Sequence, residues 1–144
     1  MAVMPGMTEP EWRAFVLAGT RTAKVATVRR DGRPHVTPIW FDLDGPELVF
    51  TTWHESVKAR SLRRDPRLAL VVDDQEPPYS YVIVEGTARF VEDPTELRAW
   101  ATRIGGRYMG PERAEEYGSR NSVPGELLVR VSIEKVIAER DIAD

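Results

Sequence analysis

The chain has 144 residues, of which 42% are hydrophobic, and this size and composition predict a single globular domain over residues 1–144. Its 20 basic and 23 acidic residues give a net charge of −3, which argues against general nucleic-acid binding, and the lack of cysteine excludes disulfides, thiol catalysis and cysteine-ligated metals. No apolar run reaches membrane-spanning length and residues 1–10 lack the basic and apolar segments of a signal peptide, so we expect a cytoplasmic protein with neither a nucleic-acid nor a membrane partner.

The first predicted element is a helix. Thr8 and Glu11 have the spacing of a capping box, in which each side chain accepts a hydrogen bond from the other residue's backbone N–H. The helix is expected to run to about Ala18 and to stop at Gly19. Residues 22–28 then alternate as a first strand.

A hairpin is expected next. Asp31-Gly32 supplies the positive φ that tight hairpin turns require. The partner strand is predicted over residues 34–41. Because Pro34 and Pro38 cannot donate ladder hydrogen bonds, this strand is expected at a sheet edge or with a bulge.

A turn over residues 42–46 and a third strand over residues 47–52 lead to a short basic helix. Ser56 suits the N-cap of that helix. Pro66 is expected to stop it, and strand character resumes at residues 67–72.

A loop and a long strand follow, over residues 73–78 and 79–90. Alternation leaves two choices for the buried face of the long strand. One face carries Val82, Val84, Gly86 and Ala88, and the other carries Tyr81, Ile83, Glu85 and Thr87.

The last third predicts helices and a closing strand. Residues 93–95 open a helix whose apolar face is Leu97, Trp100, Ala101 and Ile104, and Gly105-Gly106 is expected to weaken or end it. A short charged helix is expected over residues 111–117. The closing strand is expected over residues 125–138, with one face made of Leu127, Val129, Val131 and Ile133.

Six strands with short antiparallel connections suggest a small barrel with helices added at its ends. A doubly wound parallel sheet would need a helix between successive strands, and the connections are too short for that.

Few motifs point to catalysis by side chains alone. His35 and His54 have no sequence partners that define a triad, and no Gly-x-Ser-x-Gly elbow is present. Two histidines without cysteine match no metal-ligand spacing. Neither a Walker loop nor a Gly-x-Gly-x-x-Gly motif occurs. We therefore expect His35 on a strand surface and His54 in a turn.

The start of the basic helix is the strongest candidate site. Ser56 and Lys58 lie where a helix begins, directly after a strand that ends in Thr51-Thr52, and free N–H groups, hydroxyls and a cation together suit a phosphate. The alternative is a solvated basic face, to which Arg63, Arg64 and Arg67 are assigned.

Two tryptophans lie near the same stretches of chain. Trp40 follows Thr37-Pro38-Ile39, and Trp53 follows Thr52. Strand pairing could bring them side by side, as the walls of a planar cofactor site or as ordinary packing.

Five segments, in their order and spacing, resemble the pyridoxamine 5′-phosphate oxidase-like superfamily of split β-barrel flavoproteins. The nearest likeness is to the actinobacterial branch of deazaflavin-dependent oxidoreductases that use coenzyme F420. The segments are Ala26–Pro34, Val36–Phe41, Leu48–Thr52, Lys58–Arg67 and Val84-Glu85-Gly86. The resemblance implies a mainly β (α+β) fold, a six-stranded antiparallel split β-barrel with short flanking helices, of the FMN-binding split-barrel type.

The resemblance also implies where the cofactor lies. The segment from Thr37 to Phe41 runs along the ring, largely through its backbone. Thr51-Thr52 contacts the ring side or the ribityl chain, and Lys58 binds the phosphate. The strand around Tyr81 can reach the cofactor of a neighbouring subunit. The cofactor-binding residues expected on this basis are Thr37, Pro38, Ile39, Trp40, Thr51, Thr52, Ser56, Lys58, Tyr81 and, more weakly, Arg60.

In FMN-using relatives an arginine often precedes the lysine, whereas this chain has Val57 there, which favours F420 over FMN. The resemblance implies a homodimer with the cofactor in the interface, and hydride transfer to an electron-poor small molecule, with the cofactor doing the chemistry. Tyr79, Tyr81, Tyr108 and solvent are all candidate proton donors. The alternatives are an FMN-dependent oxidase or reductase and a non-catalytic protein that binds a cofactor or tetrapyrrole.

Overall fold

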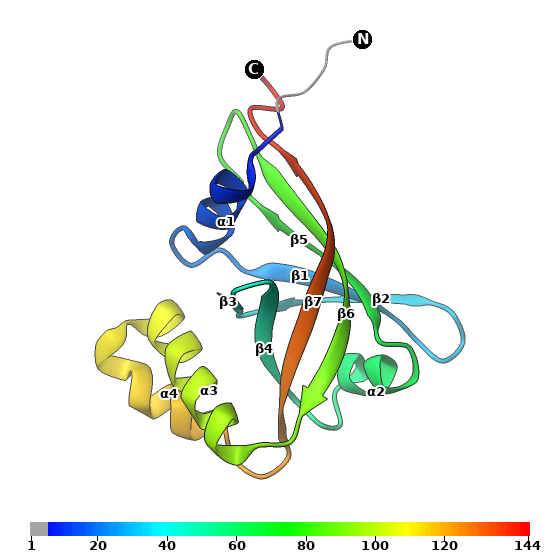
Figure 1. Cartoon of the computed structure of the whole chain (residues 1–144), viewed down its shortest axis with the longest axis vertical. Coiled ribbons are helices and arrows are strands. Elements are labelled where there is room, and N and C mark those ends of the chain that lie inside the picture. Colours follow the sequence, from blue (N-terminus) through cyan, green and yellow to red (C-terminus); the bar gives the residue numbers. More distant parts are fainter. Residues whose placement is uncertain (1–5) are drawn as a thin grey trace.

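The computed structural model describes residues 6–144, which form one antiparallel sheet of seven strands accompanied by helices (Figure 1). The strands are β1 (Ala23–Val28), β2 (Pro34–Ile39), β3 (Asp42–Asp44), β4 (Glu47–Trp53), β5 (Arg67–Asp73), β6 (Tyr81–Val91) and β7 (Glu126–Glu139). The helices are α1 (Glu9–Leu17), α2 (Val57–Arg64), α3 (Pro94–Met109), α4 (Ala114–Arg120) and a 3-10 turn at Pro111–Arg113. None of the helices in this part of the chain is long and apolar enough to cross a membrane.

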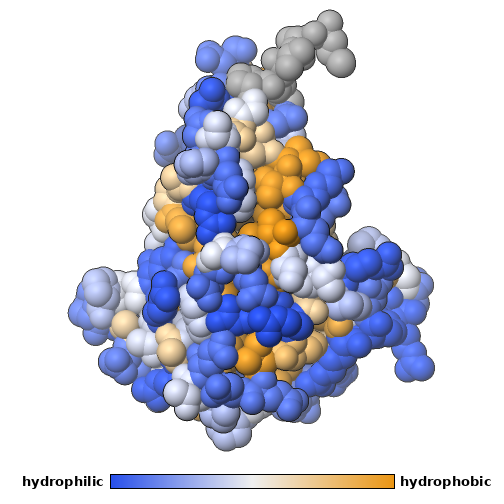
Figure 2. Space-filling model, viewed as in Figure 1, coloured by the Kyte–Doolittle hydropathy of each residue, from blue (hydrophilic) through white to orange (hydrophobic). Residues whose placement is uncertain are grey.

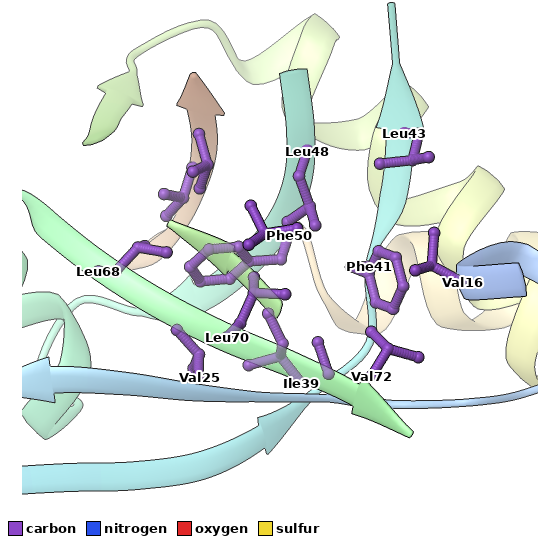
Figure 3. Close-up of a cluster of buried hydrophobic side chains, with 14 of the residues drawn as sticks. Val16, Val25, Ile39, Phe41, Leu43, Leu48, Phe50, Leu68, Leu70 and Val72 are labelled. Atoms are coloured by element: carbon purple, nitrogen blue, oxygen red, sulfur yellow. The ribbon is translucent and has the colours of Figure 1, made fainter. Parts of the chain in front are cut away.

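The sheet has the order β2-β1-β5-β6-β7-β4-β3 and curls around one main core. Side chains from segments far apart in the sequence meet inside the curl, among them Phe41, Phe50, Leu70 and Val72 (Figure 3). The antiparallel split-barrel class expected from the sequence is confirmed.

The strand count differs from the expected six because part of the predicted turn after Phe41 is a strand. Residues Asp42–Asp44 pair with β4, with Leu43 opposite Leu48. Leu43 is 8% exposed, so its burial beside Leu48 favours pairing over a free turn.

The hairpin of β1 and β2 lies at one edge of the sheet, as its prolines predict. Its register runs without a break from Ala23 opposite Ile39 to Val28 opposite Pro34, so no bulge is found there. The irregular register lies instead in the pairing of β6 with β7, at Glu85 and Gly86, where Glu134 of β7 is left without a partner on β6.

The two long strands, β6 and β7, differ in which of their faces are buried. On β6 the buried face is the one that carries Val82, Val84 and Ala88, which decides between the two choices left by alternation. On β7 the predicted face is confirmed by Val129 and Val131, which lie in the main core. Both sides of β7 are covered in its first half because the opposite face packs on α3 in a second cluster of Val49, Leu97, Trp100 and Leu128.

Most predicted helix boundaries are found, with one clear error. Thr8 and Glu11 form the capping box, and the helix ends at Leu17, two residues before Gly19, which has φ +59°. Gly105-Gly106 does not end α3, which continues to Met109. A Cβ on Gly105 would lie 2.5 Å from the Cβ of Tyr117, so these glycines let α4 pack against α3.

A buried arginine fastens α3 to the sheet. Arg130 is 8% exposed, and its guanidinium donates to Glu96 and to Asp44 at 2.8 Å and Glu47 at 3.2 Å. These contacts join β7, α3, β3 and β4. They hold α3 in place beside β4, where the candidate site lies.

Candidate functional site

A hollow of about 320 Å³ opens beside the ends of β2 and β4 and is lined by residues of α2, α3 and α4. In Figure 1, α2 lies on one side of β4, and α3 and α4 lie on the other. It is lined by Pro38, Ile39, Trp40, Thr51, Thr52, Trp53, Ser56, Lys58, Ala101, Ile104, Arg120, Asn121 and Glu126. This volume is at the low end of the roughly 300–1,000 Å³ of small-molecule and cofactor sites.

Hydroxyl groups and a helix start form the α2 side of the hollow. The Ser56 Oγ accepts a hydrogen bond from the N–H of Ala59 at 3.1 Å and lies 2.8 Å from the Oγ1 of Thr52. Ser56 is therefore the N-cap, as predicted. The first N–H groups of an α-helix have no partner inside the helix, so those of Val57 and Lys58 are left for a group outside it.

Lys58 and Glu126 are the half-buried charged groups of the hollow. Burial lowers the pKa of Lys58, and the nearby carboxylate of Glu126 opposes that shift. Burial raises the pKa of Glu126, and the charges of Arg120, His54 and Lys58 oppose it. Cations are thus gathered around a single carboxylate.

The start of β7, which carries Glu126, is clasped by the turn after β4. The backbone N–H of His54 donates to the carbonyl of Gly125 at 2.8 Å, and its Nδ1 lies 3.1 Å from the same oxygen. Gly125 has φ +103°, and a Cβ there would lie 2.5 Å from the Trp53 ring. Only glycine fits this position, and His54 is in a turn, as expected.

An aromatic stack forms the wall on the α3 side. The Trp40 and Tyr108 rings are parallel within 5°, with centroids 5.1 Å apart. The Tyr108 hydroxyl donates to the carbonyl of Arg21 at 2.8 Å and accepts from the N–H of Phe41 at 3.3 Å. Burial raises the Tyr108 pKa. Both bonding roles of this hydroxyl are filled by backbone groups, so Tyr108 positions the wall rather than supplying a proton.

The structure brings most of the predicted site residues together and leaves three apart. Those that line the hollow are Pro38, Ile39, Trp40, Thr51, Thr52, Ser56 and Lys58. Thr37 has a buried Oγ1 without a partner in the structure, on the inner side of β2, while Arg60 is exposed. Tyr81 lies opposite Glu139 and Asp73, at the other end of β6.

The basic residues set aside in the sequence lie outside the hollow. Arg64 donates to the carbonyl of Val28 at 2.7 Å, and Arg67 pairs with Asp65 at 2.8 Å. The guanidinium of Arg63 lies 5.5 Å from the Phe90 ring. These arginines are exposed and structural.

Sequence reasoning missed the wall formed by α4 and the start of β7. Ala101 and Ile104 were recognised as an apolar helix face, but not as part of a site. Arg120, Asn121 and Glu126 also line the hollow. No motif surrounds them. The packing of α4 against α3 brings Arg120 and Asn121 to the hollow, and the pairing of β7 with β4 brings Glu126 there.

Comparisons with known proteins agree with this architecture. Residues 8–139 match the family described as pyridoxamine 5′-phosphate oxidase. The conserved hypothetical protein Rv2991 from Mycobacterium tuberculosis is 29% identical, with a TM-score of 0.84 over 100% of this chain and 92% of that one.

Two further solved structures are similar over most of their length. A protein named F420 reductase is 29% identical, with a TM-score of 0.67 over 85% of this chain and 94% of its own. The heme storage protein HutZ from Vibrio cholerae is 22% identical, with a TM-score of 0.72 over 91% of this chain and 94% of its own, a likeness that shows the fold alone.

Proposed function

The chain belongs to the pyridoxamine 5′-phosphate oxidase-like family of split-barrel proteins, and from that membership we propose that it is an oxidoreductase that uses the deazaflavin coenzyme F420. It transfers a hydride between the reduced cofactor and an electron-poor organic small molecule. The observation that carries the proposal is the hollow itself, in which Lys58 and the capped start of α2 face an aromatic wall.

The α2 side of the hollow suits the cofactor phosphate. The Lys58 ammonium, the N–H groups of Val57 and Lys58, and the hydroxyls of Thr52 and Ser56 converge there. Charge-assisted hydrogen bonds of this kind are the strong ones, and a helix N-terminus adds favourable potential. Lys58 is also half-buried, so solvent screens its charge only in part.

The β2 side suits a flat ring. Ile39 is buried beside Pro38, which has no N–H, and both lie at a sheet edge where backbone groups are free to meet a ligand. Trp40 is held by its stack on Tyr108. When bound, the cofactor supplies the hydride chemistry, and these residues orient it and keep water away.

The choice of F420 over FMN rests on the cation count at the start of α2. Val57 occupies the position at which FMN-using relatives often carry an arginine, and it is 43% exposed. Arg60, the next cation of α2, does not line the hollow. Similarity to a protein named F420 reductase supports the same choice.

We propose that a second copy of the chain completes the hollow. An apolar stretch runs over β6 and β7 in Figure 2, bordered by hydrophilic residues. Strand pairing sets Val71, Ile83 and Ile137 side by side on the outer face of the sheet, and Tyr81 shares that face. On the same face of β2, Val36 is 64% exposed. An apolar sheet face of this kind favours association.

Turnover tests the proposal directly. The purified protein, supplied with reduced F420, is expected to oxidise this cofactor in the presence of an enone or a quinone. The reaction is monitored through the return of the oxidised cofactor's absorbance. Lys58→Ala should lose activity at low cofactor concentration. Binding of cofactor without reduction of any compound in the panel would instead support a non-catalytic binding protein.

Sedimentation tests the proposed homodimer. The wild-type protein is expected to sediment as a dimer, and Ile83→Lys, on the outer face of β6, should shift it toward the monomer. The matched control is Val123→Lys, which adds the same charge at an exposed apolar residue (46%) of the loop before β7, away from the outer face of the sheet. A wild-type monomer at micromolar concentration would contradict this part of the proposal.

A further inference from the structure

Glu126 lies at the junction of two hollows. It lines the main hollow with Lys58, and it also lines a neighbouring apolar crevice of about 360 Å³. The crevice is formed by the start of α3 and the loop before β7, with Val91, Leu97, Val123 and Leu127 among its walls. Among the residues that line the main hollow, Glu126 is the one carboxylic acid.

Its carboxylate is held near cations but not paired with them. Arg120 from α4, His54 from the turn after β4 and Lys58 from α2 act on it through space, and no hydrogen bond contributes to its titration. Its backbone, in contrast, is fixed by the His54–Gly125 clasp and by pairing with Trp53. The backbone of Glu126 is therefore fixed in position, while its carboxylate is free to contact a ligand.

The four tyrosines of the chain are poorly placed for the same task. Tyr117 does not line the hollow, and its hydroxyl accepts from the Arg113 guanidinium at 3.4 Å. The Tyr108 hydroxyl is bonded to two backbone groups, and Tyr81 lies at the far end of β6. Tyr79 is 45% exposed and does not line the hollow.

We propose that the Glu126 carboxyl group supplies the proton that accompanies hydride transfer in this site. The inference rests on the proposed function and names the residue that supplies the proton for it. In reduction of an enone, the substrate's β-carbon gains a hydride from the reduced deazaflavin, and two electrons come with it. The O–H bond of Glu126 breaks, and a C–H bond forms at the α-carbon. The carboxylate that remains regains a proton from water.

Cofactor binding favours the protonated form of the Glu126 carboxyl group. Burial already raises the pKa of Glu126, against the opposing charges of Arg120, His54 and Lys58. The negatively charged phosphate of the cofactor offsets the opposing charge of Lys58, so the pKa of Glu126 rises further on binding. Between the pKa values of the free and bound states, binding therefore takes up a proton.

Calorimetry of F420 binding tests this step without turnover. Titrations at several pH values between 5 and 8, each in two buffers that differ in ionisation enthalpy, give the number of protons taken up at each pH. We expect uptake by the wild-type protein and by Glu115→Gln, an exposed acid of α4 that does not line the hollow. Glu126→Gln should bind with equal or higher affinity and lose the uptake.

Single-turnover oxidation of reduced F420, with whichever enone or quinone the wild-type protein reduces, gives the second readout. Glu126→Gln should be at least about 100-fold slower, at the low end of the roughly 10²–10⁴-fold supplied by a positioned acid. Glu126→Asp, which keeps the acid, should recover part of that loss. Unchanged proton uptake in Glu126→Gln, or wild-type turnover by it, would overturn the inference and leave the proposed function standing. Absence of F420 binding by the wild-type protein would overturn both.

Discussion

The Trp40 and Tyr108 rings lie face to face, 5.1 Å between centroids and 5° from parallel, and so join the segment after β2 to the last turn of α3. Around this stack, Arg107 donates to the carbonyl of Val16 at 2.9 Å and to that of Phe41. The end of α3 is therefore bonded to backbone on α1 and on the segment between β2 and β3. The wall of the hollow is set by these contacts before any ligand binds.

Tyr108→Phe should lower stability and leave chemistry intact. The ring keeps its stack on Trp40, but the hydroxyl's bonds to Arg21 and Phe41 are lost. Leaving such buried groups unpaired costs about 1–3 kcal/mol, which urea unfolding would measure. Loss of turnover with unchanged stability would show that the hydroxyl acts in the reaction.

Lys58→Ala should weaken cofactor binding. Loss of a charge-assisted phosphate contact costs roughly 1.5–3 kcal/mol, or roughly 10- to 150-fold in the dissociation constant. Arg63→Ala is the control, because Arg63 lies on the same helix but outside the hollow. Equal dissociation constants for the wild-type protein and Lys58→Ala would mean that the α2 start is only a solvated basic face.

Alkaline pH should weaken binding earlier than an ordinary lysine would. Burial lowers the pKa of Lys58 from 10.5, and a phosphate binds the charged form. Affinity is therefore full below that lowered pKa and falls as the pH rises through it. Dissociation constants measured from pH 7 to 10.5 should begin to rise before pH 10.5 is reached, which means weaker binding. This rise should be absent in Lys58→Arg.

Arg130→Met should destabilise the fold. The substitution keeps an apolar stem but leaves Asp44, Glu47 and Glu96 without their shared cation. The three carboxylates that remain are partly exposed and Glu47 also pairs with Arg89, so we expect a loss of about 1.5–3 kcal/mol, the value for hydrogen bonds to charged groups. Arg98→Met removes an arginine from the exposed pair with Glu115, and its unfolding free energy should stay within about 1 kcal/mol of wild type. Similar losses of unfolding free energy in both variants would contradict the conclusion that Arg130 holds α3 against the sheet.

Local signals in the sequence predicted local structure well. The Thr8–Glu11 capping box, the Ser56 N-cap and the Asp31-Gly32 turn depend on neighbours within a few residues, and all are found. The family resemblance extended these signals to the barrel class and to the Lys58 side of the hollow.

The rest depended on contacts between distant segments. Gly105-Gly106 has low helix propensity, but the close approach of α4 outweighs it. Asp42–Asp44 becomes a strand through burial of Leu43. Glu126 has no motif, and its place beside Lys58 follows only from the pairing of β7 with β4. These positions required the fold.

Titration of the purified protein with coenzyme F420 and with FMN, followed by tryptophan fluorescence, tests the central claim most directly. Trp40 and Trp53 line the hollow, whereas Trp12 and Trp100 are buried elsewhere in the core clusters. F420 is expected to quench the emission and to bind at least tenfold more tightly than FMN, with the quenching reduced in Trp40→Phe. Tight FMN binding with no binding of F420 would contradict the claim.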